Sequence, residues 1–170
     1  MSRQATPPAT VRPLDRIDRR ILRTLQADGR IAIVDLADKV GLAATPCSER
    51  VKRLERDGFI LGYHARLDPH RLGQHLLVFV EIKLAAKSGA IFDDFRREVL
   101  KLPNVLECHL VSGEFDYLIK ARIPEMGAYR KLLGDMLLAL PGARESRSYM
   151  VMEEIKESLV LDLPETQARA

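Results

Sequence analysis

The sequence predicts an α+β protein in which an N-terminal winged helix-turn-helix is followed by a ferredoxin-like βαββαβ sandwich. Three observations predict this fold. Up to residue 68, apolar side chains recur with the 3.6-residue period of helices in three short segments. Beyond it, strands with a two-residue alternation are separated by two helical stripes. Charge also divides the chain, because residues 1–68 carry 13 Lys and Arg against 9 Asp and Glu, whereas residues 69–170 carry 14 against 15.

Two short helices hinged at a glycine form the centre of the first part. Apolar residues at spacings i, i+3, i+4 and i+7 give residues 33–40 a single buried stripe. The same period in residues 14–25 predicts a preceding helix that completes a three-helix core. Gly41 ends the first helix of the pair, because glycine adopts a positive φ without steric cost. Two short extended stretches within residues 59–67 predict a wing after the second helix.

The second helix of the pair has a narrow apolar stripe and an open face that carries cations and hydroxyls. In the major groove of DNA, Arg and Lys contact guanine edges and phosphates, and hydroxyls contact either. We therefore expect a recognition helix, with simple solvation of a charged face as the alternative. Arg50 lies on the flank of the apolar stripe, where we expect an internal salt bridge. The expected DNA-contacting residues are Thr45, Ser48, Glu49, Lys52, Arg53 and Arg56.

The second part has the element order of a split βαβ, an antiparallel four-stranded sheet with both helices on one face. Two helices cover only one face of such a sheet, yet Leu118, Phe79, Met150 and Met152 suggest that apolar side chains emerge on both faces. An exposed apolar surface is normally an interaction site, so we expect sheet-to-sheet dimerisation, which would also pair two recognition helices. The expected elements are strand 76–84, helix 92–102, strand 105–111, strand 115–123, helix 126–140 and strand 147–154.

These patterns divide the chain into three segments. We expect a flexible N-terminal arm over residues 1–13, which have little to bury. A winged helix-turn-helix DNA-binding domain should occupy residues 14–68, and a ferredoxin-like oligomerisation domain residues 69–170. The boundary falls at Asp68-Pro69, because proline restricts its predecessor. The net charge of +4 up to this boundary, against −1 beyond it, is the electrostatic footprint expected of a nucleic-acid-binding domain.

Several classes of protein are disfavoured by the composition. No apolar run approaches the length of a membrane span and the start lacks a signal-peptide core, so we expect a cytoplasmic protein without a membrane partner. Cys108 and His109 are strand neighbours that point to opposite faces and cannot form a catalytic dyad. The histidines lack metal-site spacing, and no glycine-rich phosphate loop is present. We therefore expect no enzyme, no catalytic residue, no metal and no cofactor.

Seven motifs in order together resemble the Lrp/AsnC family over about residues 14–160. The resemblance implies a bacterial regulator of transcription that binds double-stranded DNA and controls amino-acid metabolism in response to a bound amino acid such as leucine. It also implies homodimers that assemble into octamers. A constitutive DNA-organising architectural protein without an effector is the alternative. The motifs are L-D-R-I-D-R-R-I-L at 14–22, D-G-R-I at 28–31, V-G-L-A-A-T-P-C-S-E-R-V-K-R-L-E-R-D-G-F-I at 40–60, L-L-V-F-V-E-I at 76–82, E-C-H-L-V-S-G-E-F-D-Y-L-I-K at 107–120, A-Y-R-K-L-L-G at 128–134 and V-M-E-E at 151–154.

The same resemblance implies an amino-acid effector held in a cleft between neighbouring dimers. A zwitterion needs hydrogen-bond donors for its carboxylate and an anion for its ammonium, and a glycine turn beside Asp116 offers both. Such a turn on its own would be read simply as a hairpin. The positions that match the family's effector contacts are Gly113, Glu114, Phe115, Asp116, Met126, Leu138, Tyr149, Met150 and Val151.

The start of the recognition helix departs from the family pattern. Many members have Ser or another capping residue where this chain has Ala43, and the loss of an N-cap costs about 1 kcal/mol. Thr45 followed by Pro46 could cap a later start, because proline is favoured at the first helical position. The register of the first turn is therefore open.

Overall fold

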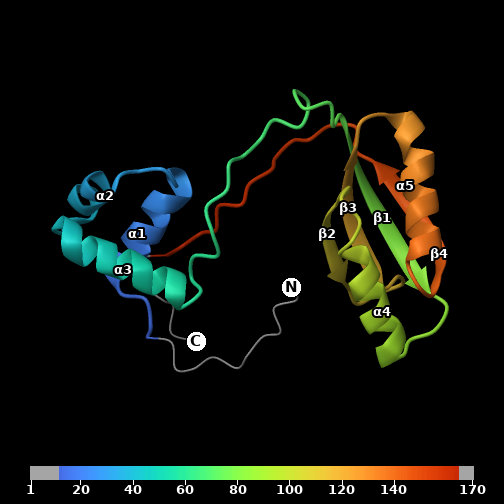
Figure 1. The fold of residues 1–170 in the computed structure, drawn as a ribbon, viewed down its shortest axis with the longest axis horizontal. Coiled ribbons are helices and arrows are strands. Elements are labelled where there is room, and N and C mark those ends of the chain that lie inside the picture. The colour runs from blue at the N-terminus through green and yellow to red at the C-terminus, as the bar shows by residue number, and fades with distance from the viewer. Residues whose placement is uncertain (1–11, 165–170) are drawn as a thin grey trace. The chain divides into compact units, whose positions relative to one another are not determined.

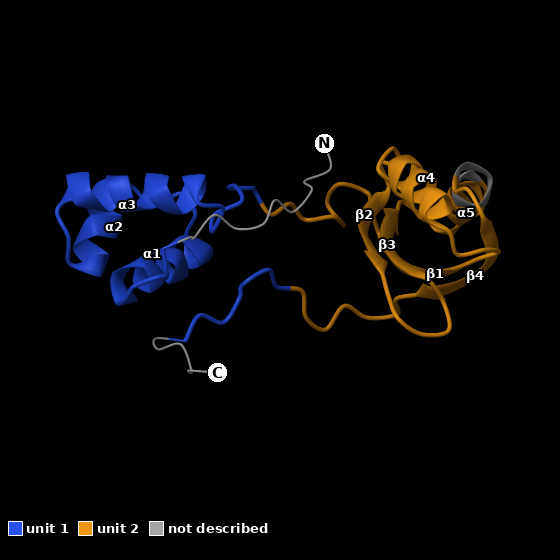
Figure 2. Ribbon diagram, turned by 90° about the horizontal axis from the view of Figure 1, so that it is seen from below, with its two compact units in different colours: residues 1–65, 158–170 blue, residues 66–157 orange. Residues whose placement is uncertain are grey.

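The computed structural model describes residues 12–164, apart from the side chains of residues 135–139. The chain forms two compact units, one comprising residues 1–65 with residues 158–170 and the other residues 66–157 (Figure 2). Of the expected N-terminal arm, residues 1–11 lie outside the described residues. The sequence boundary assigned residues 158–164 to the second domain, whereas the structure groups them with the first unit.

Three helices form the first unit: α1 (Arg16–Ala27), α2 (Ile33–Val40) and α3 (Ala44–Arg56) (Figure 1). Asp15 caps α1 in a reciprocal capping box with Asp18. Gly41 has the predicted left-handed conformation, with φ 75°, where α2 ends. The predicted stripes meet in one core, which contains Ile21, Leu22, Leu36, Ala37, Val40, Cys47, Val51 and Leu54.

A segment from the C-terminal end of the chain packs on the outside of this helical unit. Leu163 contacts the helical core. The side-chain amide of Gln26 donates to the carbonyl of Leu161 at 3.1 Å and accepts from its N–H at 2.7 Å. Arg23 Nε donates to the carbonyl of Leu163 at 2.8 Å. These contacts hold the segment in an extended conformation along α1.

The second unit is a four-stranded antiparallel sheet with strand order β2-β3-β1-β4 (Figure 1). Helices α4 and α5 lie on the same face of the sheet (Figure 2), as the split βαβ pattern predicted. The elements are β1 (Leu76–Leu84), α4 (Gly89–Val99), β2 (Val105–Leu110), β3 (Tyr117–Ile123), α5 (Met126–Ala139) and β4 (Ala143–Met150).

The side chains of β1 alternate between the two faces of this sheet. Val78, Val80 and Ile82 are fully buried on the helix side. In the same core, the rings of Phe95 and Tyr117 stack with centroids 3.9 Å apart.

The opposite side of the sheet, which we call the open face, is covered by no described helix of this unit (Figure 2). Most of its residues are of intermediate or high exposure, but the register partners Leu77 and Arg122 are each only 7% exposed, and Arg122 pairs with Glu154. Met150, one of the apolar residues that suggested a second apolar face, packs on the helix side as the register partner of Val78.

The expected strands of the wing are not found in the segment that follows α3. The predicted extended stretches in residues 59–67 form no strand within the described residues. Tyr63 from this segment instead donates a hydrogen bond to Glu55 of α3 at 3.0 Å.

Among the described residues, no helix has the length and apolar character needed to cross a bilayer.

Candidate DNA-binding and effector sites

Helix α3 presents four of the six expected DNA-contacting side chains to solvent. Thr45, Glu49, Lys52 and Arg56 are all exposed, whereas Ser48 is half-buried. The apolar stripe of Cys47, Val51 and Leu54 anchors the opposite side of the helix in the core. The helix is therefore anchored from behind and exposes Lys52 and Arg56 on its outer face. Arg56 contacts Asp57, with Nε 3.2 Å from Oδ1, but its side chain remains 73% exposed and accessible to a polyanion.

Arg53 does not belong to this outer face, which corrects its expected role as a base-contacting residue. Its side chain is only 17% exposed, and Nη2 lies 2.5 Å from Oδ1 of Asp18, a carboxylate with no exposed surface. A long side chain near the edge of the helix can turn inward when a buried acid is within reach. Arg50 forms the predicted internal salt bridge, with Nη1 at 2.6 Å from Asp15 and 2.7 Å from Asp18.

The recognition helix begins earlier than the proposed cap at Thr45 would allow. Ala43 is the N-cap residue, with φ −76° and ψ 158°, and it provides no side-chain capping bond. Pro46 therefore lies within the first turn, where its missing N–H costs little because the first N–H groups of a helix have no intrahelical acceptor. An uncapped helix start with positive partial charge also suits a neighbouring phosphate.

Tyr63 fixes the segment that follows α3. Burial and the hydrogen bond to the Glu55 carboxylate raise the pKa of the Tyr63 hydroxyl to about 12. The phenol thus stays protonated and continues to donate at physiological pH. This contact explains how the segment remains close to the recognition helix without strand pairing.

The expected effector loop connects β2 to β3. Gly113 has φ 144°, and the N–H of Val111 donates to the carbonyl of Asp116 at 2.9 Å, which closes the turn. Glu114 is exposed and Phe115 is half-buried. Asp116 is buried, so this loop contains one protected carboxylate next to a glycine turn.

The Asp116 carboxylate is held by two donors. Its Oδ2 accepts the N–H of Leu84 at 2.8 Å, and its Oδ1 lies 2.8 Å from Nζ of Lys87. Burial acts to raise the pKa of Asp116, but the hydrogen bonds from Lys87 and Leu84 outweigh it and lower the pKa below its ordinary value. Asp116 is therefore ionised at neutral pH, and sequence reasoning missed Lys87 because it lies in a different loop.

The remaining effector candidates lie at the opposite end of the sheet. Tyr149 is exposed, and Met150 and Val151 are half-buried, at the end of β4, whereas the exposed Met126 begins α5 after β3. Asp116 precedes the seven residues of β3, so about 20 Å of strand separates it from Met126. The side chain of Leu138 lies outside the described residues. Within one chain, the effector candidates therefore form two groups at opposite ends of the sheet.

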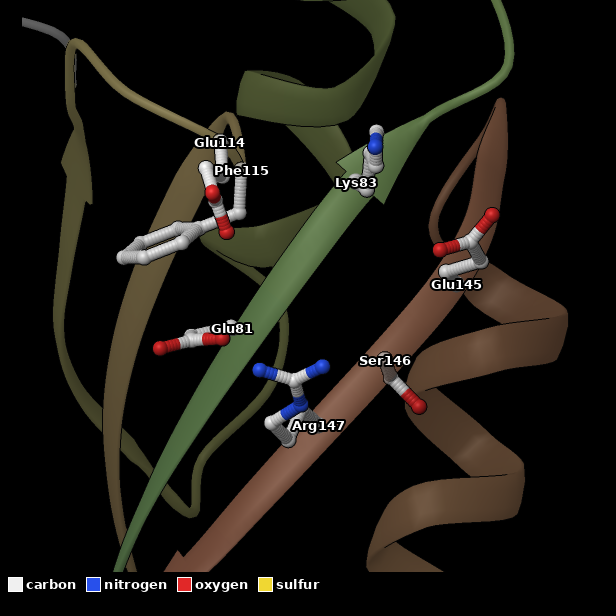
Figure 3. Close-up of a pocket in the computed structure, with 7 residues that line it drawn as sticks. All are labelled: Glu81, Lys83, Glu114, Phe115, Glu145, Ser146 and Arg147. Carbon is white, nitrogen blue, oxygen red and sulfur yellow. The ribbon is translucent and has the colours of Figure 1, made fainter.

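The open face of the sheet contains a shallow polar pocket of about 280 Å³ (Figure 3). Glu81 from β1 and Arg147 from β4 lie side by side on this face, and they are register partners in the sheet. Tyr149 donates to Glu81 at 3.0 Å. Cross-strand pairs of opposite charge were visible in the sequence only if the strand register was known. The lining residues are Glu81, Lys83, Glu114, Phe115, Glu145, Ser146 and Arg147.

Cys108 and His109, the two residues considered as a catalytic dyad, lie in environments that do not suit catalysis. Burial raises the pKa of the Cys108 thiol to about 11, so the sulfur is not a thiolate near neutral pH. His109 Nε2 lies 3.1 Å from a carboxylate oxygen of Glu107. The described residues contain no group of three or more side chains that could hold a metal ion.

The first unit is a helix-turn-helix with a cationic outer face. The second is an antiparallel sheet, covered by helices on one face, with a buried carboxylate in a loop. Together they define a DNA-binding protein with an effector domain. Residues 14–60 match the family described as winged helix-turn-helix DNA-binding, and residues 77–161 match the Lrp/AsnC ligand binding domain. The chain belongs to the Lrp/AsnC family. The predicted family and fold class are thereby confirmed.

Individual relatives support the same conclusion. The chain is 60% identical over 145 residues to the leucine-responsive regulatory proteins of Escherichia coli K12 and Salmonella typhimurium, covering 85% of this chain and 88% of each relative. A crystal structure of an AsnC family transcriptional regulator from Agrobacterium tumefaciens has a TM-score of 0.83 at 38% identity, covering 88% of this chain and 97% of that one. A transcriptional regulator from Neisseria meningitidis in complex with L-Met has a TM-score of 0.82 at 35% identity, with the same coverages.

Proposed function

We propose that this protein is a sequence-specific DNA-binding regulator of transcription in amino-acid metabolism, whose activity responds to a bound amino acid such as leucine. The observation that carries the proposal is the exposed cationic face of α3, anchored by a buried apolar stripe, in a chain that also contains an effector domain. The names of its relatives support an apolar amino acid, because they include leucine-responsive proteins and a complex with L-Met.

A constitutive architectural protein is the less favoured function. Such a protein needs a DNA-binding unit and an assembly surface but no effector domain. Here the match to a ligand binding domain spans residues 77–161, and the effector loop contains a buried, ionised carboxylate. A regulator rather than an enzyme, acting in the cytoplasm on the nucleoid, is the function that fits these features and the relatives.

The working form is proposed to be a homodimer that assembles further, with an octamer as the expected product. The open face offers Phe79 and Leu118 beside the charged pair Glu81 and Arg147, a mixture that can complement a second copy across a twofold axis. Since one chain separates Asp116 from Met126 and Tyr149, a complete amino-acid site requires loops from neighbouring copies. Assembly and sensing are therefore coupled in this proposal.

The DNA-binding part is tested by fluorescence anisotropy with an operator fragment selected from random sequence. Lys52→Ala removes an exposed cation from the open face of α3, and we expect a loss of about 1–3 kcal/mol in binding free energy. Lys101→Ala is the matched control, because it removes an exposed lysine from the second unit. Equal affinity of the two variants would remove α3 from the DNA interface.

The sensing part uses the same fragment with and without L-leucine or L-methionine. We expect the amino acid to change the affinity of the wild-type chain for DNA, and to leave the Asp116→Asn variant unaffected although it still binds DNA. Asparagine keeps the shape of the side chain and removes the negative charge that an ammonium needs. A full amino-acid response in Asp116→Asn would move the effector site elsewhere.

A further inference from the structure

The ion pair between Asp116 and Lys87 is asymmetric in its exposure. The Asp116 side chain is 5% exposed, whereas the Lys87 side chain is 64% exposed and belongs to the short loop between β1 and α4. One carboxylate oxygen is committed to the backbone N–H of Leu84, and the other faces the Lys87 ammonium. The backbone donor is fixed by the sheet, but the lysine donor is at the end of a flexible chain that can move into water.

We propose that Lys87 is an internal competitor for the effector, whose ε-ammonium occupies the position that the α-ammonium of the amino acid takes when it binds. The inference rests on the proposed amino-acid sensing at Asp116 and adds how that site is regulated. The exchange replaces one primary ammonium by another, so the charge and the hydrogen bond to Oδ1 are conserved. No proton needs to be gained or lost.

Burial of the carboxylate explains why a competitor is useful. An unpaired charge with so little exposed surface is costly, so a chain without effector needs a cation at this position. Lys87 supplies it, and the effector must then displace Lys87 before it can bind. The net affinity for the amino acid is thus set by the difference between two ammonium–carboxylate contacts, which allows the domain to release its ligand when the amino acid is scarce.

A second lysine pair in the same unit lacks this buried acid. Lys101 pairs with Glu98 at 2.7 Å with a similarly exposed side chain, 62%, but the Glu98 side chain is 26% exposed. Water can therefore replace Lys101 around Glu98 at little cost. At Asp116, by contrast, the carboxylate is buried and Oδ1 is held by the exposed Lys87, so a ligand ammonium takes this contact by displacing that lysine.

Isothermal titration of the full-length protein with L-leucine and L-methionine tests the exchange. Lys87→Met keeps most of the apolar stem and removes the competing charge, so we expect tighter binding, by about fivefold if the pair resembles other partly exposed ion pairs. Lys87→Arg retains a cation with more hydrogen-bond donors, and we expect binding weaker than in the wild type. Lys101→Met is the matched control and should leave the affinity unchanged.

A probe without an ammonium group separates exchange from general loosening of the loop. For 4-methylpentanoate, which has the carboxylate and side chain of leucine but no amine, Lys87→Met should give no gain in affinity. Unchanged amino-acid affinity in both Lys87 variants, or an equal gain for 4-methylpentanoate, would overturn the exchange while leaving sensing intact. Absence of amino-acid binding by the wild type and by every variant would instead overturn the proposed sensing function itself.

Discussion

Asp18 shows how one residue can determine what the recognition helix presents. Its side chain has no exposed surface and accepts from Arg50 at 2.7 Å and from the backbone N–H of Asp15 at 3.1 Å, while Arg53 lies 2.5 Å away. Two of the cations of α3 are therefore neutralised inside the helical unit. The helical period predicts that Arg50 lies on the flank of the apolar stripe of α3. It could not reveal that Arg53 turns inward, because Asp18, the acid that attracts Arg53, lies on α1.

Asp18→Asn should strongly destabilise the helical unit. The amide keeps the size of the side chain but removes the charge that two arginines share, and breaking a buried ion pair costs about 3–5 kcal/mol. We expect a corresponding loss of hydrogen-exchange protection in α1 to α3, measured by mass spectrometry, with the sheet of the second unit unaffected. Asp38→Asn, at an exposed position on α2, is the control. Equal protection in the two variants would contradict the role assigned to Asp18.

Asp116 gives the second unit a specific dependence on pH. Because its pKa is lower in the folded state than the ordinary 3.8, its ionised form stabilises the fold at higher pH. This contribution is complete above pH 3.8 and is lost as the pH falls through the lowered value. We expect the free energy of unfolding, measured by urea denaturation between pH 5 and pH 2, to fall less steeply in Asp116→Asn than in the wild type. Asp93→Asn, at an exposed site, should retain the wild-type slope.

At the scale of elements, periodicity predicted most helices and strands because each buries one face. The fourth strand is an exception: it was expected at residues 147–154 and is observed as β4 at Ala143–Met150. The stripes of α1, α2 and α3 and the alternation in β1 and β3 all appear in the structure close to their predicted bounds. The predicted start of β3 at residue 115 shifts to Tyr117, because Asp116 is used to close the loop. The extended stretches in residues 59–67 are not strands in the described chain, since a glycine-interrupted segment carries no periodic signal that distinguishes strand from coil.

The candidate effector site was only partly predictable, because some of its contacts join residues that are far apart in the sequence. The family resemblance pointed to the turn at Gly113 and the carboxylate of Asp116, which lie together in one loop. Lys87 belongs to another loop that reaches Asp116 only through the sheet register, and the open-face pair of Glu81 and Arg147 requires the order of the strands. Contacts between elements depend on topology and register, which a single sequence specifies only indirectly.

The connection between α5 and β4 depends on a glycine for two reasons at once. Gly142 has φ +76°, and an added Cβ would lie 2.9 Å from Cγ2 of Ile91. Gly73, with φ +74° in the same unit, has nothing within 4 Å of the corresponding position. Gly73→Ala should therefore cost only the left-handed conformation, about 1 kcal/mol, whereas Gly142→Ala should cost at least about 1 kcal/mol more for overpacking. Urea denaturation of both variants measures the difference, and equal losses would mean that Ile91 moves aside freely.

At the scale of the whole molecule, the proposed dimer depends on the open face. A single recognition helix makes few contacts with DNA, and paired half-sites recover the affinity only when two helices are linked. The open face has the composition for such a link, with half-buried Phe79 between the register partners Lys120 and Tyr149 and with charged pairs around it. Dimerisation through this face would also bury apolar surface that no described helix covers.

Phe79→Asp is expected to separate this dimer. The substitution places a carboxylate at the centre of the open face, and in a twofold dimer the two new charges would face an interface that excludes water. We expect light scattering after size-exclusion chromatography to show a monomer, and operator affinity to fall about a hundredfold because the two recognition helices are no longer linked. Leu100→Asp is the control, since Leu100 is 67% exposed at the end of α4, on the helix-covered side of the sheet. If the Phe79 variant remained dimeric while the Leu100 variant dissociated, the interface would lie on the helix side, and the effector cleft would have to be rebuilt from that surface.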